Sequence, residues 1–145
     1  MSRTLDIADA VVTELAGAPP GTFALPFTPQ RRVLPQFELS ELKDLKVTVV
    51  PRSVENSPAA RGLTLKDVQI DIGIQKRLGK DVDSEIVPLL TLVEQIDGWL
   101  RQRPLQAAGN APWLKSANDP LYASEHLAED RVFTSVLTVS YRVMV

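Results

Sequence analysis

LKDVQIDIGIQKRL, residues 65–78, carries the strongest structural signal in this chain. Apolar side chains alternate with polar ones or glycine along it, in the order Val68, Gln69, Ile70, Asp71, Ile72, Gly73, Ile74 and Gln75. A period of two places the isoleucines on one face of a β-strand and the polar side chains on the other. Such a two-faced strand is typical of an antiparallel sheet that is covered on one side only.

The chain predicts further strands on either side of this one. Residues 131–145 alternate in the same way, with Phe133, Leu137 and Tyr141 on the apolar face. Lys46–Val50 is dense in β-branched residues, and Pro51 is expected to end that strand. Two weaker candidates are Thr22–Phe27, an edge strand or extended arm that Arg31–Leu34 continues before a turn at Pro35, and Tyr122–Leu127.

Two segments have the spacing of amphipathic helices. Thr4–Ala16 places Leu5, Ala8, Val12 and Leu15 on one face and ends before Gly17. The second helix begins at a cap on Asp83 or Ser84 and runs to about Arg103. Its apolar stripe has five members: Leu89, Leu92, Val93, Ile96 and Leu100. One or two helical turns are expected over Leu39–Leu45.

These elements predict an α+β fold in which a mostly antiparallel β-sheet packs against two main helices. The 145 residues fit a single domain, and 44% hydrophobic residues suffice for a core without disulfides or metals.

Two long segments are predicted to be loops. Arg52–Gly62 is rich in Ser, Asn, Pro and Ala, and Leu105–Pro120 contains several Gly, Pro and Asn residues. A loop as long as Arg52–Gly62 is either an arm that orders against a neighbouring subunit or a tolerated surface excursion. The candidate interface residues are Arg52, Ser53, Val54, Glu55, Asn56, Arg61, Phe23, Phe27 and Trp113.

The sequence offers little that supports catalysis. It contains no cysteine, and His126 is its only histidine, which is expected at the surface or at a sheet edge. No phosphate-binding glycine motif occurs, and Asp81–Glu85 lacks the glycine of a calcium-binding loop. We therefore expect a protein that is not an enzyme and that holds no cofactor or metal.

The charge pattern leaves two interpretations open. Sixteen basic and 18 acidic residues give a net charge of −2, which is too balanced for strong backbone binding to nucleic acid. Arg31, Arg32, Lys76 and Arg77 either line a channel in an assembled ring or are scattered solubilising charges. No apolar run is long enough to cross a membrane, and the polar N-terminus does not resemble a signal peptide, so a cytoplasmic location is expected.

The order of these segments resembles the tail terminator (tail completion) proteins of long-tailed bacteriophages of the lambda type. The resemblance rests on five stretches: IADAVVTELAG (7–17), KVTVVP (46–51), VQIDIGIQKRL (68–78), VPLLTLVEQIDGWL (87–100) and RVFTSVLTVSYRV (131–143). It implies a virion protein of the tail and neck, made in the host cytoplasm, with no catalytic residues to carry over.

The same resemblance implies a homohexameric ring that caps the head-proximal end of the tail tube. Its partners would be the tail tube protein and a neck connector or stopper protein, with DNA passing through the ring without sequence-specific binding. Three alternatives remain open. They are another neck protein, a small-molecule-binding or enzymatic α+β domain, and an adaptor of the cytosol. We expect deletion of Ser53–Ala60 to leave the monomer folded and to impair assembly.

Overall fold

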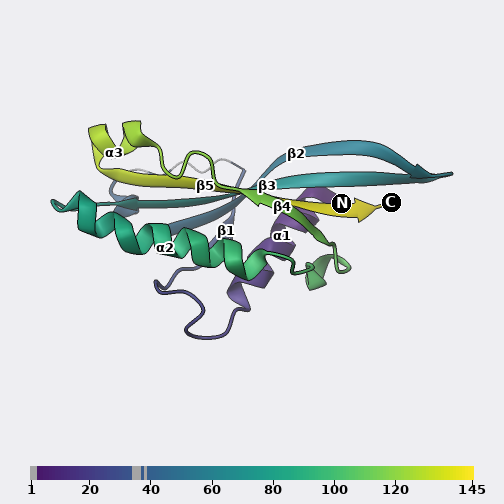
Figure 1. Cartoon of the computed structure of the whole chain (residues 1–145), viewed down its shortest axis with the longest axis horizontal. Coiled ribbons are helices and arrows are strands. Elements are labelled where there is room, and N and C mark those ends of the chain that lie inside the picture. The colour runs from purple at the N-terminus through teal and green to yellow at the C-terminus, as the bar shows by residue number, and fades with distance from the viewer. Residues whose placement is uncertain (1–2, 34–36, 38) are drawn as a thin grey trace.

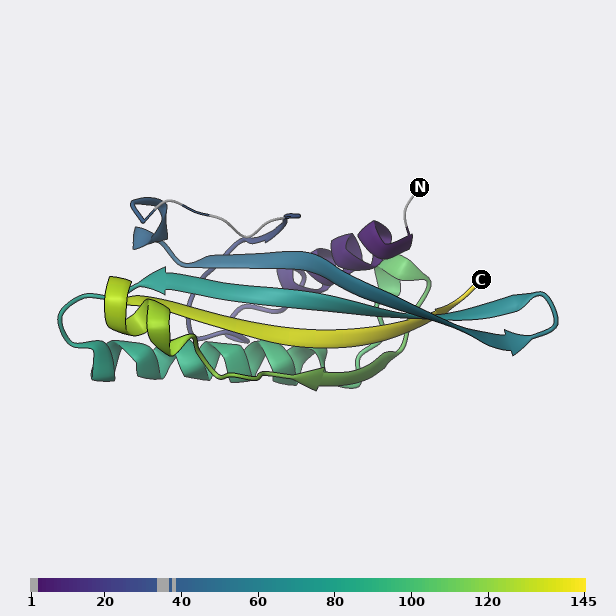
Figure 2. The same ribbon diagram turned by 90° about the horizontal axis from the view of Figure 1, so that it is seen from above.

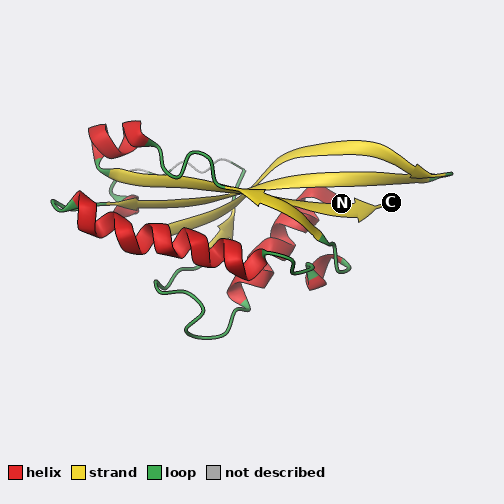
Figure 3. Cartoon of the chain, viewed as in Figure 1, coloured by secondary structure: helices red, strands yellow, loops and turns green. Residues whose placement is uncertain are grey.

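The computed structural model describes residues 3–33, 37 and 39–145, which form three α-helices, two single turns of 3-10 helix and five strands (Figures 1 and 3). In chain order these are α1 (Arg3–Ala16), β1 (Pro29–Arg31), η1 (Glu41–Lys43), β2 (Lys46–Ala60), β3 (Leu63–Arg77), α2 (Val82–Leu100), η2 (Gln106–Ala108), β4 (Trp113–Ala117), α3 (Ser124–Asp130) and β5 (Val132–Met144).

The strands form one sheet in the order β1-β2-β3-β5-β4. Only β1 and β2 run parallel, and the other three pairs are antiparallel. Helices α1 and α2 lie on the same face of this sheet, as Figures 1 and 2 show together. The predicted α+β architecture, a mostly antiparallel sheet packed against two main helices, is therefore confirmed.

The core lies between these two helices and the apolar face of the sheet. Alternate residues of β3 from Val68 to Ile74 are fully buried, as the period of two predicts. The predicted stripe of α2 is buried along its whole length. In α1 the buried face is rotated from the predicted one, because Ile7 and Val11 are buried whereas Leu5 and Val12 are only half-buried.

The prediction that Pro51 ends a strand and that Arg52–Gly62 is a loop is wrong. Strand β2 continues through Pro51 to Ala60, and a turn at Arg61 and Gly62, where Gly62 has φ +77°, returns the chain into β3. The register of β2 against β3 shifts between Pro51 and Ser53 and again between Pro58 and Ala60. Both prolines are tolerated because this part of β2 has no strand on its outer side, where the missing N–H would be needed.

Three further boundaries differ from the predictions. The predicted loop Leu105–Pro120 contains β4, which pairs with β5 over Thr138–Tyr141. Beside the earlier part of β5 lies the predicted strand Tyr122–Leu127, in which the Ala123 N–H donates to the Thr134 carbonyl oxygen at 2.8 Å. That segment is not a strand, and it leads into α3 instead. At the opposite edge the strand is Pro29–Arg31 rather than Thr22–Phe27, and the predicted turn at Leu34 and Pro35 lies outside the described residues.

The ends of the shorter helical segments also differ from the predictions. The expected turns at Leu39–Leu45 are a single 3-10 turn. Helix α2 is capped by Asp81, whose carboxylate accepts a hydrogen bond from the Ser84 backbone N–H at 3.4 Å, and it ends at Leu100. Among the described helices, none is both long and apolar enough to cross a membrane.

Two glycines should respond in opposite ways to alanine. A Cβ on Gly73 would lie 2.8 Å from the buried Thr48 Oγ1, whereas a Cβ on Gly98 would meet nothing within 4 Å. We expect Gly73→Ala to lower the free energy of unfolding by about 1–2 kcal/mol because the close contact must be relieved. Gly98→Ala should raise it by about 0.5–1 kcal/mol because Gly98 lies inside a helix. Urea unfolding of both variants measures the difference, and equal changes would contradict it.

Candidate assembly surface

A β-hairpin extends from the body of the protein beyond both helices (Figures 1 and 2). It consists of residues 52–66, the end of β2 and the start of β3, and we call it the arm. None of its residues belongs to the buried core. Two of its larger apolar side chains, Val54 and Leu63, are 36% and 42% exposed. The arm therefore contributes no fully buried apolar side chain to the core of the monomer.

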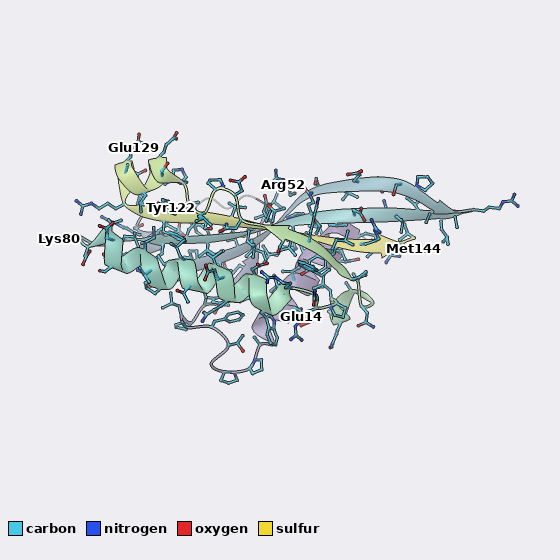
Figure 4. All side chains as sticks on the ribbon, in the orientation of Figure 1. Glu14, Arg52, Lys80, Tyr122, Glu129 and Met144 are labelled. Atoms are coloured by element: carbon cyan, nitrogen blue, oxygen red, sulfur yellow. The ribbon has the colours of Figure 1, made fainter. Side chains whose placement is uncertain are left out.

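Hydrogen bonds between strands hold the arm in its extended form. Val54, Asn56 and Ser57 stand opposite residues of β3 in a regular antiparallel register. The Lys66 ammonium donates to Asn56 Oδ1 at 2.9 Å across the hairpin. A third strand runs beside the arm almost to its tip, because Thr64, the partner of Pro58, exchanges two backbone hydrogen bonds of 2.8 and 3.0 Å with Val145. Figure 4 labels Arg52 where the arm leaves the body, and Met144, which pairs with Leu65 further out along the arm.

The face of the sheet opposite α1 and α2 carries charged side chains near the base of the arm. Arg142 donates two hydrogen bonds to the Asp67 carboxylate, at 2.8 and 3.1 Å. Asp71 accepts a bond of 2.7 Å from the Thr138 hydroxyl and a longer one of 3.4 Å from Arg52. Arg52 and Thr138, together with Lys115, line a groove of about 280 Å³. The groove region thus combines basic and acidic groups.

The ion pair between Asp67 and Arg142 predicts how the stability of the protein depends on pH. The hydrogen bonds from Arg142 hold the pKa of the Asp67 carboxyl below its ordinary value of 3.8, although partial burial opposes this. A lowered folded-state pKa stabilises the protein above that ordinary value, and the gain is lost as pH falls through the folded pKa. We expect Asp67→Asn to lower the melting temperature by about 1–3 °C at pH 7.

The melting temperatures of Asp67→Asn and of the unchanged protein should differ by a constant gap from pH 8 to 5. This gap should close at lower pH. Differential scanning calorimetry across that range measures it. Glu94→Gln is the control, because Glu94 is exposed on α2 and forms no ion pair with a described residue. A gap that persists unchanged at pH 2.5 would show that the ion pair is not its source.

The structure divides the candidate interface residues into two groups. Arg52, Ser53, Val54, Glu55, Asn56 and Arg61 all lie on the arm, and all are exposed. The aromatic candidates pack instead against the core of the same chain. Phe23 and Phe27 contact each other with ring centroids 5.1 Å apart, and Trp113 stands opposite Tyr141 in the sheet. Burial raises the pKa of the Tyr141 hydroxyl, which therefore stays protonated at neutral pH.

The four basic residues predicted to face a channel do not form one cluster. Arg31, on β1, is bound to Asp9 of α1 at 2.6 Å, and the Arg32 guanidinium lies 4.5 Å from the centre of the Phe37 ring. Lys76 and Arg77 lie at the far end of β3, with β2 between β3 and β1. A channel role for these four residues stays a prediction.

His126 is exposed on α3, with its Nδ1 atom 3.0 Å from the Thr134 hydroxyl. The expected surface position of this histidine is confirmed. A search of the described residues finds no group of three or more His, Cys, Asp or Glu side chains placed to hold a metal ion.

A second surface feature, a groove between α1 and η2, could not be predicted from the sequence. This α1–η2 groove has a volume of about 450 Å³. It is lined by Arg3, Asp6, Ile7, Asp9, Ala10, Thr13, Ala107, Ala108, Gly109 and Val143. Its two walls are about a hundred residues apart in the sequence, so no local pattern could indicate that they meet.

No family model matches the chain, and no curated protein matches it significantly.

Proposed function

We propose that this chain is a virion structural protein, a tail terminator that assembles as a ring on the head-proximal end of a phage tail tube. The observation that carries the proposal is the arm. Ordering a residue costs about 1–2 kcal/mol of backbone entropy, which proteins usually offset by burying apolar surface. None of the residues 52–66 is fully buried in the core of its own chain. A partner that packs against the arm would supply the missing burial.

A ring explains why the arm extends from one end of the folded molecule. Closed rings are built from heterologous contacts, in which one patch of a subunit binds a different patch of the next. An arm that reaches beyond the body supplies the first patch without disturbing the core. We infer that copies of this chain bind one another in this way, as a hexamer, and that the two faces of the ring meet the tail tube protein and a neck connector or stopper protein. DNA would pass through the centre.

Electron microscopy tests this function directly. Tail tubes grown from the tube protein of the same genome should be uniformly capped at one end when the purified chain is present, and should grow to uncontrolled lengths without it. Tails of normal length that fail only in head joining would favour the alternative, another neck protein. Tubes that neither bind the chain nor change with it would contradict both roles.

A further inference from the structure

We propose that the tip of the arm, residues 58–62, docks into the α1–η2 groove of a second copy of this chain. This inference rests on the proposed ring and identifies the two surfaces that would join its subunits.

The tip is built from small side chains around a single charge. Pro58, Ala59, Ala60 and Gly62 surround Arg61, and all five residues are exposed. No ion pair joins Arg61 to another described residue. Two prolines on β2, Pro51 and Pro58, lack the N–H groups that a further strand would need, so strand addition along this edge is disfavoured. The narrow tip is the part of the arm that remains suited to insertion.

The α1–η2 groove has a complementary lining. Alanines at positions 10, 107 and 108 leave room for a narrow insert, while Asp6 and Asp9 add two carboxylates against one arginine, Arg3. Asp9 is already bound to Arg31, but no ion pair joins Asp6 to a described residue. A carboxylate in the first turn of α1 also interacts favourably with the helix dipole, which alone would explain Asp6. Ala10 and Ala108 also pack in or against the core of their own chain, and Ala107 is the exposed member of the alanine lining.

The two surfaces cannot meet within one chain. In both Figure 1 and Figure 2 the tip lies at the far end of the arm, whereas α1 lies back beside its base. Strand β5 holds the arm in this extended direction, because Leu65 pairs with Met144 and Thr64 bonds to Val145. The groove must therefore be filled by the arm of another copy. Because tip and groove are different patches, the contact is heterologous and can close a ring.

Cysteine cross-linking tests this contact cleanly, because the chain contains no cysteine of its own. The double variant Ala60→Cys with Ala107→Cys, treated with a short bismaleimide at concentrations where the protein self-associates, should give a ladder of covalent oligomers that ends at the closed ring. Each single variant should give dimers at most. The matched control pairs Ala60→Cys with Ala128→Cys, which places the second thiol on the exposed, acidic α3.

Two results would overturn the docking. One is an assembled protein without a ladder, and the other is an equal ladder from the α3 control, which would assign the arm to α3. If the unchanged chain caps tubes but neither double variant gives a ladder, this inference is wrong and the proposed function stands. If the chain neither self-associates nor caps tubes, both are wrong.

Charge exchange gives an independent measure of the same contact. Arg61→Asp should weaken self-association about tenfold or more in sedimentation, and Asp6→Arg should do the same. The double variant should recover most of that loss, because the pair is restored in reverse. Arg61 is exposed at the tip, so its replacement leaves the monomer fold intact, and thermal melting checks the Asp6 variant. No recovery in a folded double variant would contradict the pairing of these two residues.

Discussion

Replacing residues 57–65 with Asn-Gly should abolish self-association while lowering the melting temperature by less than about 3 °C. The shortened hairpin keeps the pairing of Asn56 with Lys66 and of Val54 with Val68. Asn-Gly supplies the two-residue turn that such a hairpin prefers. No residue that is removed belongs to the buried core, so little folding energy is lost. Sedimentation velocity measures the association, and calorimetry measures the melting temperature.

This replacement is a sharper test than deleting Ser53–Ala60. That deletion would remove one strand of the hairpin and leave Leu63–Val68 without its partner on that side. A loss of stability would then reflect the unpaired strand as much as the arm. For the symmetric replacement, a fall in melting temperature of 10 °C or more would show that the arm belongs to the folding unit. Unchanged association would contradict its role in assembly.

The sequence predicted the elements whose periodic pattern continues for many residues. Strands β3 and β5 and helices α1 and α2 were found because burial on one face imposes a period of 2 or 3.6 on side chains. The arm was missed as secondary structure because residues 52–60 are exposed except for Ser57, so no buried face imposes a period of two on them. Its strand conformation depends on pairing with β3, which composition does not reveal, and its Ser, Asn and Pro residues are typical of loops.

The candidate surface was predictable only in part. Arg52–Asn56 and Arg61 are exposed on the arm. This exposure was predictable because a mainly polar run rarely enters a core. Phe23, Phe27 and Trp113 are partly buried against the core of their own chain, and their expected role at an interface stays a prediction. The choice between the two sites for an aromatic ring depends on tertiary contacts. The α1–η2 groove depends on such contacts entirely.

Ile72→Ala should cause a loss of stability far larger than that of any change in the arm. Ile72 is fully buried in the middle of β3, opposite Val49 on one side and Leu137 on the other. Removing its outer carbons leaves a cavity between the sheet and the helices, and such substitutions cost about 3–4 kcal/mol. For a domain of this size the melting temperature should fall by about 10 °C. Chemical denaturation measures the free energy directly.

The matched control is Leu63→Ala, which shortens an aliphatic side chain on the same strand. Leu63 is 42% exposed, so this change should cost less than about 1 kcal/mol because the side chain lies outside the buried core and is already partly in contact with water. Similar losses for the two variants would contradict the division of β3 into a buried half and an exposed half. A large difference would mean that one continuous strand serves two purposes. Its buried half would then hold the fold together, and its exposed half would remain free to bind a neighbouring subunit.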